Sequence, residues 1–182
     1  MNLSAVQHPI PEAPSLTQAA QAVLDDVMAR VPQLDTAGLV AQLQARPDTV
    51  VIDVRTAPEL AALGGRIDAP RFANVLRGWL EFQMETVVPD KNTPVVVYCG
   101  VSQRSPLAAE TLLKLGYKDV KNYRDGFFNW KRAGGSVVPT DAAPRSFLYD
   151  LPKEVVPGVW SAIGATAPGT YENSGHNNNL SF

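Results

Sequence analysis

Apolar and polar residues alternate with two different periods between residues 32 and 139. Short apolar runs that are rich in β-branched residues favour buried strands, and apolar residues three or four positions apart favour helices. The predicted strands are 32–34, 49–54, 72–75, 95–98 and 118–123, and the predicted helices are 35–43, 58–63, 76–86, 105–115 and 127–133. Strands that alternate with helices in this way predict an α/β fold, in which helices cover both faces of a central parallel sheet.

The segment before this domain predicts one additional helix. Three prolines oppose regular structure in residues 1–14, and we expect a tail there. From Ser15 to Val31 apolar residues recur every four positions, and Ser15 is the predicted N-terminal cap. The residues of the apolar face are Ala19, Val23, Val27 and Val31. We expect this amphipathic helix to pack on its own domain in preference to a partner subunit.

The alternation stops after Val138, and prolines punctuate the chain from there onward. Residues 155–163 favour a strand that turns at Pro157 and Gly158, and residues 170–182 are rich in asparagine and glycine. We therefore expect an irregular C-terminal extension. The predicted division of the chain is a tail with a helix at 1–31, an α/β domain at 32–139 and an extended segment at 140–182.

Cys99 lies where a predicted strand ends and a predicted helix begins. Ser105 and Pro106 favour the helix start, the first as a cap and the second through its fixed φ. The N–H groups of the short loop and the positive end of the helix dipole together favour an anion at this point. A thiolate held there is a nucleophile at neutral pH. Position alone also allows the alternative that Cys99 is an inert core cysteine.

The composition narrows the classes of function. With 182 residues the chain is long enough for one domain with a sizeable core plus extensions, and its 45% apolar and 19% charged residues are typical of a soluble globular protein. The single cysteine excludes an internal disulfide and a relay between two cysteines of one chain. A net charge of -2 gives no reason to expect nucleic acid or an anionic membrane as a partner.

The sequence shows no signal for insertion in a membrane or for export. No apolar run is long enough to span a bilayer, and the N-terminus lacks the basic and apolar pattern of an uncleaved signal peptide. We therefore expect a cytoplasmic protein. A chain from which a signal peptide had been removed would look the same, so a periplasmic location stays open.

Charged residues near the predicted strand ends have both structural and functional interpretations. Asp53 ends an apolar strand, and its carboxylate needs a partner that Arg55 or a nearby N–H group can supply. We favour a structural ion pair there over a chemical role. Arg66, Arg71 and Arg77 can steer an anionic substrate toward the cysteine, although such arginines are more often simply solvated.

Residues 98–105, Tyr-Cys-Gly-Val-Ser-Gln-Arg-Ser, resemble the active-site loop of the rhodanese-like sulfurtransferases. Three further segments resemble motifs of that family in the same order. They are 51–55 together with Glu59, 65–70 with departures at Arg66 and Ala69, and 125–130 with Asp125 in place of a glycine. The resemblance covers about residues 33–138 and implies a single rhodanese-like domain.

The resemblance implies a sulfurtransferase that moves a sulfane sulfur from thiosulfate or a low-molecular-weight persulfide to a thiol or to cyanide. Cys99 is the implied nucleophile and would carry the sulfur as a persulfide. The implied substrate-binding residues are Gly100, Val101, Ser102, Gln103, Arg104 and Ser105. The N–H groups of this loop would stabilise the persulfide anion, and Asp53 and Arg55 would support it. No metal or organic cofactor is required, and the expected partners are a small-molecule sulfur donor and a thiol acceptor.

Two other classes of function stay open. Rhodanese-like folds also host phosphatases and arsenate reductases, in which the loop arginine comes six residues after the cysteine, whereas Arg104 follows Cys99 by five. The chain can also be a non-catalytic sulfur carrier or interaction module of a longer fusion. Thiosulfate sulfurtransferases of the family often have a basic residue early in the loop. Gly100 and Val101 are neutral, which leaves room for a glutathione persulfide as donor.

The C-terminal segment carries a second, shorter resemblance. Residues 158–164, 171–173 and 177–182 are similar to the opening strands of metallo-β-lactamase-fold hydrolases. That family's cluster of metal-binding histidines is absent, because the only histidines of the chain are His8 and His176. If the resemblance holds, the chain is the leading part of a longer fusion or a remnant of one. The alternative is an irregular tail that wraps its own domain or a neighbour. Through it or through the N-terminal helix, the chain could join a second copy in a homodimer or a fusion partner.

Overall fold

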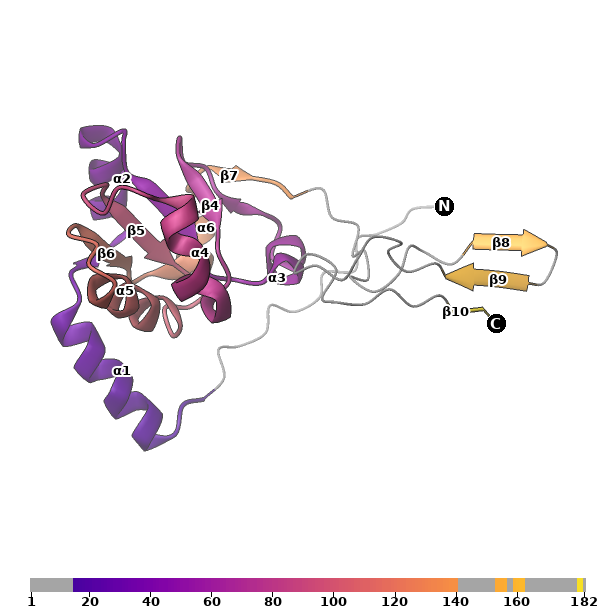
Figure 1. Cartoon of the computed structure of the whole chain (residues 1–182), viewed down its shortest axis with the longest axis horizontal. Coiled ribbons are helices and arrows are strands. Elements are labelled where there is room, and N and C mark those ends of the chain that lie inside the picture. The colour runs from indigo at the N-terminus through magenta and orange to yellow at the C-terminus, as the bar shows by residue number, and fades with distance from the viewer. Residues whose placement is uncertain (1–14, 141–152, 157–158, 163–179, 182) are drawn as a thin grey trace. The chain divides into compact units, whose positions relative to one another are not determined.

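The computed structural model describes residues 15–140, 153–156, 159–162 and 180–181 (Figure 1). The chain forms two compact units, Met1–Thr140 and Asp141–Phe182. The first unit contains Cys99 and all the strands that were predicted before residue 139.

A five-stranded sheet forms the centre of the first unit, in the strand order β1-β6-β5-β2-β4. Its strands are β1 (Gln33–Leu34), β2 (Val50–Asp53), β4 (Phe72–Asn74), β5 (Val95–Tyr98) and β6 (Val120–Tyr123). Every neighbouring pair is parallel. The strand before Cys99, β5, is the middle one, and all four of its residues are buried. Burial on both faces explains why this strand is apolar without alternation.

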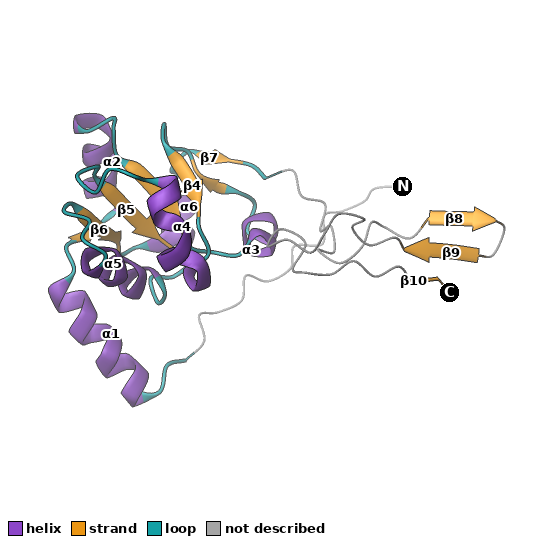
Figure 2. Cartoon of the chain, in the orientation of Figure 1, coloured by secondary structure: helices purple, strands orange, loops and turns teal. Residues whose placement is uncertain are grey.

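Helices cover both faces of the sheet (Figure 2), as the sequence predicted. They are α1 (Gln18–Arg30), α2 (Thr36–Ala45), α3 (Ala57–Ala62), the 3-10 helix η1 (Arg77–Trp79), α4 (Leu80–Val87), α5 (Ser105–Lys114) and α6 (Gly126–Arg132). Successive side chains of a strand point to opposite faces. Val95 and Val97 accordingly pack in one cluster with α1, α4 and α5, and Val96 and Tyr98 pack in the other with α2 and α6. A separate antiparallel pair joins β3 (Arg66–Ile67) to β7 (Val137–Val138).

The N-terminal helix α1 packs on its own domain, against α5, and it begins later than expected. Thr17 is its N-cap, and the Thr17 hydroxyl accepts a hydrogen bond from the N–H of Ala20 at 3.2 Å. The prediction of Ser15 as the cap was therefore wrong. Ser and Thr have similar capping preferences, so sequence alone does not choose between two such residues that lie close together.

The buried side of α1 differs in part from the predicted face. Val27 and Val31 are buried as expected, and Leu24 is buried with them. Val23 is 57% exposed, so its assignment to the packed face was wrong. An α-helix turns by 100° per residue, so a strict four-residue repeat drifts around the helix, and Leu24 replaces Val23 at the contact.

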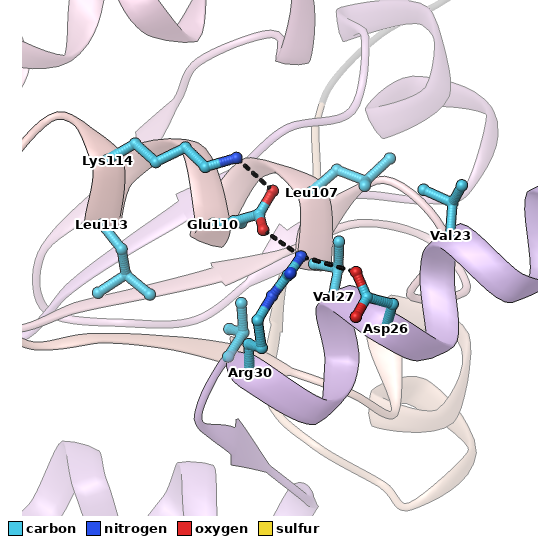
Figure 3. Close-up of a pocket in the computed structure, with 9 residues that line it drawn as sticks. Val23, Asp26, Val27, Arg30, Leu107, Glu110, Leu113 and Lys114 are labelled. Carbon is cyan, nitrogen blue, oxygen red and sulfur yellow. Dashed lines mark hydrogen bonds and ion pairs between the residues drawn. The ribbon is translucent and has the colours of Figure 1, made fainter.

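An open groove remains between α1 and α5 (Figure 3). Val23 lines it from α1 and Leu107 lines it from α5. The Arg30 guanidinium lies between the carboxylates of Asp26 and Glu110, at 2.9 and 2.6 Å. The polar groups that Figure 3 shows in the groove are therefore paired with one another.

The described residues of the second unit form a small antiparallel sheet in the order β10-β9-β8. Its strands are β8 (Lys153–Val156), β9 (Val159–Ala162) and β10 (Leu180–Ser181). Most of the extension that was predicted to be irregular lies outside the described residues. The strand predicted at 155–163 corresponds to two strands, β8 and β9, on either side of Pro157 and Gly158. The tail predicted at 1–14 and most of the segment that resembles hydrolases lie outside the described residues.

No helix among the described residues is both long enough and apolar enough to cross a membrane. No group of three or more His, Cys, Asp or Glu side chains among them could hold a metal ion.

Candidate active site around Cys99

Cys99 directly follows the last residue of β5, so it lies at the carboxyl end of the central strand of a parallel sheet. Ligands of open α/β sheets bind at this edge. The side chain of Cys99 is completely buried and belongs to the apolar cluster under α1, α4 and α5. A reagent must therefore pass the loop that follows Cys99 before it can reach the sulfur.

The loop from Gly100 to Arg104 connects Cys99 to helix α5, which begins at Ser105. Pro106 occupies the first turn, as predicted, but no side chain caps this end of the helix. The Ser105 hydroxyl is buried and has no hydrogen-bond partner among the described residues. Our prediction of Ser105 as a capping residue was therefore wrong, because Ser105 is already the first residue of the helix.

Several backbone N–H groups of this loop lack a backbone carbonyl partner in the part of the chain that the structure describes. Among the described residues, no backbone carbonyl accepts a hydrogen bond from the N–H groups of Val101, Ser102, Arg104 or Ser105. The first N–H groups of any helix lack intrahelical acceptors, and the helix dipole adds a partial positive charge. The loop therefore has several donors available to an anion beside Cys99.

The start of α6 supports the loop from the other side. The N–H of Phe127 donates to the carbonyl oxygen of Cys99 at 2.9 Å, and the N–H of Phe128 donates to that of Gly100 at 3.2 Å. Gly126 makes this approach possible, because a Cβ atom there would lie 2.5 Å from the Gly100 carbonyl oxygen. The φ of Gly126 is +70°, which also favours glycine.

Arg104 is held by Glu59 of helix α3 in a two-point contact. The distances are 2.9 Å from Nη1 to Oε2 and 2.5 Å from Nη2 to Oε1. Glu59 also closes a capping box with Thr56 at the start of α3, where it accepts from the Thr56 N–H at 2.9 Å. Burial alone would raise the pKa of Glu59, but the hydrogen bonds from Arg104 and Thr56 outweigh it and lower the pKa to about 2.

The electrostatics of Arg104 also involve Cys99. Glu59 is the main reason why the pKa of Arg104 is raised, and Cys99 adds a smaller contribution. The Arg104 guanidinium therefore interacts with both groups. Through its two-point contact with Glu59 it ties the loop to α3.

Asp53 and Arg55 form a buried ion pair, as the sequence predicted. The Arg55 Nη2 atom lies 2.6 Å from Asp53 Oδ2 and 2.9 Å from the Gly65 carbonyl oxygen. The guanidinium carbon lies 4.0 Å from the centre of the Phe127 ring and 5.5 Å from that of Tyr98. Burial works against the charge of Arg55, but Asp53 outweighs it and raises the pKa of Arg55.

This ion pair contacts the residues on either side of the site without reaching the sulfur. Tyr98 directly precedes Cys99, and Phe127 donates its N–H to the Cys99 carbonyl. The Tyr98 hydroxyl in turn accepts from the N–H of Ile67 at 3.1 Å. The contacts favour the structural interpretation of Asp53 and Arg55.

The three arginines with a predicted steering role are all engaged elsewhere. Arg66 lies over the Phe72 ring, with 4.2 Å between its guanidinium carbon and the ring centre. Arg71 donates to a backbone carbonyl at 2.9 Å. Arg77 donates to Glu81 at 2.9 Å and to Thr111 at 3.1 Å. These contacts favour the alternative that the three arginines are surface residues with local partners.

Three residues of the site were not identified from sequence. Glu59 belongs to a segment that resembles a family motif, but the sequence analysis assigned it no role. Its capping box with Thr56 can nevertheless be predicted from the sequence. Asn122 of β6 donates to the Ser102 hydroxyl at 3.1 Å, and its polar side chain between the apolar residues Val120 and Tyr123 of a predicted strand was an unused signal. Gln33 bonds Asn122 at 2.6 Å across 89 positions of sequence, and no local pattern indicates that contact.

Comparisons with known proteins agree with this geometry. The family model described as Rhodanese-like domain matches residues 36–133, more than half of the chain. A protein named sulfurtransferase from Allochromatium vinosum is 31% identical over 108 residues, which are 59% of this chain and 95% of that protein. The polysulfide-sulfur transferase homodimer of Wolinella succinogenes is similar in structure, with a TM-score of 0.60 and 29% identity over 70% of this chain and 93% of that chain.

A second solved structure has the same degree of similarity. It is a protein of unknown function from Rhodopseudomonas palustris that is named as a possible tyrosine phosphatase. Its TM-score is 0.60 and its identity is 29%, over 70% of this chain and 100% of that chain. Similarity of fold therefore leaves the choice between sulfur and phosphate chemistry to the residues of the loop.

Proposed function

Because the chain belongs to the family of rhodanese-like domains, we propose that it is a sulfurtransferase that carries the transferred sulfur on Cys99 as a persulfide. The observation that carries this proposal is the place of Cys99 at the carboxyl end of β5. There its side chain is buried and followed by a loop in which several N–H groups donate to no backbone carbonyl among the described residues, and Arg104 of this loop interacts electrostatically with it. This environment favours a thiolate and then a persulfide anion at the same point.

The first half of the reaction is a displacement at sulfur. The Cys99 thiolate attacks the outer sulfur of the donor and forms a new S–S bond, while the donor's own bond to that sulfur breaks. The leaving group takes the electron pair and departs as sulfite from thiosulfate, or as a thiolate from a low-molecular-weight persulfide. No outside oxidant or reductant is consumed, because the exchange follows the same course as thiol–disulfide exchange.

The second half of the reaction restores the enzyme. A thiolate or cyanide attacks the outer sulfur of the Cys99 persulfide, and the Cys99 thiolate leaves with the electron pair. The products are a new persulfide or thiocyanate. Throughout the cycle the loop from Gly100 to Ser105 faces an anion, so its N–H groups need not reorient between the two halves.

The contacts of the arginines favour a persulfide such as glutathione persulfide over thiosulfate as the donor. Thiosulfate is a dianion and needs cationic groups that are available to it. Arg104 is bound to Glu59, and Arg66, Arg71 and Arg77 have the partners described above. The first two loop residues, Gly100 and Val101, are neutral. The sulfur group of a glutathione persulfide carries at most one negative charge, whereas thiosulfate carries two.

Phosphatase or arsenate reductase chemistry is the alternative, and the similarity to the Rhodopseudomonas protein is the observation in its favour. A phosphate ester needs an arginine that closes on its oxygens. Arg104 would have to leave Glu59 to do so. The loop is also one residue shorter than in the phosphatase relatives.

Thiocyanate formation by the full chain tests the proposal. Cyanide serves as acceptor, and thiosulfate or glutathione persulfide serves as donor, with Cys99→Ser as the control for uncatalysed transfer. We expect thiocyanate from the wild type above this control, with a higher kcat/KM for glutathione persulfide. No thiocyanate from either donor, together with hydrolysis of an aryl phosphate, would establish the phosphatase alternative. Uptake of sulfur without turnover would indicate a carrier module.

The remaining expectations about partners and location are proposals as well. A homodimer or a fusion partner would contact α1 or the segment after residue 140, and sedimentation of the full chain distinguishes a dimer from a monomer. A cytoplasmic location, with a thiol acceptor from the reduced thiol pool, fits a cysteine that must stay reduced to act.

A further inference from the structure

Asn122 is a buried polar residue on β6, the strand between β1 and β5. It lies on β6, opposite Val97 of β5, and is completely buried. Its side-chain nitrogen donates to the Gln33 Oε1 atom at 2.6 Å and to the Ser102 hydroxyl at 3.1 Å. A buried amide in a strand costs stability unless it is hydrogen-bonded, so a polar residue at this position indicates a role for its hydrogen bonds.

The direction of these hydrogen bonds is fixed from the end of α1. The Gln33 side-chain nitrogen donates to the carbonyl oxygens of Val31 and Met28, at 2.8 and 3.3 Å. Carbonyls only accept hydrogen bonds, so the Gln33 nitrogen must face α1 and its Oε1 atom must face Asn122. Asn122 must then direct its side-chain nitrogen toward Gln33, and the same nitrogen donates a hydrogen bond to the Ser102 hydroxyl oxygen. The chain of bonds has only one consistent orientation.

Ser102 is the point at which this chain of bonds meets the catalytic loop. Its φ is +57°, and it is the one residue other than glycine with a positive φ among the described residues. Residues with a Cβ atom adopt this conformation rarely and at a cost. The φ and ψ of Ser102 orient the two peptide groups beside it, so they decide where the neighbouring N–H groups of the loop point.

We propose that Asn122 is a positioning residue for sulfur transfer: it holds Ser102 in its left-handed conformation, and Gln33 fixes the orientation of Asn122. The proposal rests on the proposed function. Gln33 and the two carbonyls that orient it lie outside the residues matched by the family model, so α1 adds to the site a contact from beyond that segment. Asn122 never touches the substrate and acts only through the loop.

The test is a double-mutant cycle on the rate of persulfide formation at Cys99, measured over a range of glutathione persulfide concentrations. The variants are Ser102→Ala, Asn122→Leu and the two combined. We expect each single variant to lower the maximal rate about five- to ten-fold, the worth of one buried hydrogen bond. The half-saturating donor concentration should change less than about two-fold, and the combined variant should be no slower than the slower single variant.

Two further variants separate positioning from a loss of stability. Tyr117→Phe removes one buried hydrogen bond, from the Tyr117 hydroxyl to the Val88 carbonyl at 2.7 Å, in the turn that precedes β6 at the other end of that strand. It should lower the melting temperature and leave the rate unchanged. Ser102→Gly accepts a positive φ without strain, so it should fold even where Asn122→Leu does not, and it should still be slow because the loop is no longer held.

The outcomes separate this proposal from the one it rests on. A wild-type rate in folded Asn122→Leu or Ser102→Gly would overturn the positioning role, as would losses that multiply in the combined variant. In both cases the wild type still takes up sulfur, so the proposed function stands. No sulfur uptake by the wild type and Tyr117→Phe would overturn the proposed function and the positioning role together.

Discussion

At the scale of single residues, Gly126 decides how closely α6 approaches the catalytic loop. The N–H groups of Phe127 and Phe128 donate to the Cys99 and Gly100 carbonyls. These hydrogen bonds can form because Gly126 has only a hydrogen atom where a Cβ would meet the loop. The Cys99 carbonyl is thereby turned toward α6. In the proposed reaction, the N–H side of the loop is then left for the persulfide anion.

Gly126→Ala should therefore disturb the site more than an equivalent substitution elsewhere. A Cβ at residue 126 would lie 2.5 Å from the Gly100 carbonyl oxygen, so the loop must shift. Gly134→Ala is the matched control, because Gly134 has a similar φ of +75° and nothing lies within 4 Å of a Cβ there. Both variants should lose about 1–2 kcal/mol of unfolding free energy through backbone strain.

The two glycine variants should differ in activity. We expect thiocyanate formation to fall at least about ten-fold in Gly126→Ala and to change less than about two-fold in Gly134→Ala, since a misplacement of about 1 Å in a site is enough for a loss of this size. Equal rates in the two folded variants would show that the approach of α6 does not shape the site.

Glu59 makes the stability of the folded protein depend on pH in the acid range. Its pKa is about 2 in the folded protein, below the ordinary value of 4.5, so the folded state binds fewer protons than the unfolded state between those values. The stability that Glu59 contributes is complete above about pH 4.5, the ordinary value, and is lost as the pH falls toward 2.

Glu59→Gln should remove this dependence. The difference in unfolding free energy between wild type and variant should be largest near neutral pH and should shrink between pH 4.5 and about 2.5, as measured by urea denaturation. Glu85→Gln is the control, because Glu85 pairs with Lys91 on an exposed surface where solvent screens the interaction. A difference for Glu59→Gln that stays constant over this range would contradict the assignment.

The sequence identified residues whose partners lie close to them in the chain and missed residues whose partners are distant in sequence. Cys99 and the pair of Asp53 and Arg55 were found because both features are local: a strand end, and two charges two positions apart. The contact between Arg104 and Glu59 joins residues 45 positions apart, and it forms only when α3 and the loop meet in the fold. The apolar pattern contains no information about such a pair.

At the scale of elements, the strands were predicted more accurately than the helix ends. β5 begins and ends where its apolar run does, because both faces of that strand are buried. The cap predicted at Ser15 was wrong because Thr17, a residue with a similar preference, caps α1 instead. The cap predicted at Ser105 was wrong because Ser105 is the first residue of α5 and no side chain caps that end. The helix predicted at 76–86 is divided into η1 and α4, and no side chain caps either start.

Helix α1 offers a test of packing at this scale. Val27 is buried against the domain, whereas Val23, one turn earlier, is 57% exposed. Val27→Ala should lower the free energy of unfolding by about 1.5–2.5 kcal/mol, because it removes two buried carbon groups and leaves a space. Val23→Ala should change it by less than about 0.5 kcal/mol.

Denaturation of the two valine variants also bears on the role of α1 in assembly. A loss for Val23→Ala as large as that for Val27→Ala would mean that the outer face of α1 is buried in solution, as it would be in a homodimer. If that loss also disappears on dilution of the protein, a second copy of the chain covers the face.

At the scale of the whole molecule, the order of the motifs carried more information than the periodicity. The pattern of strands and helices predicted a parallel sheet covered on both faces, but it could not give the order β1-β6-β5-β2-β4. That order places β6, the last strand of this sheet in the sequence, beside β5 and so brings Asn122 to the loop. The rest of the site follows from topology and not from any local pattern.

The account depends on one claim, that Cys99 takes up and releases a sulfur atom. Intact mass spectrometry of the full chain tests it directly, after incubation with thiosulfate or with glutathione persulfide and again after addition of cyanide. We predict a gain of one sulfur atom in the wild type, its loss on addition of cyanide, and no gain in Cys99→Ser. A wild-type mass that is unchanged by both donors, or an equal gain in Cys99→Ser, would contradict the account.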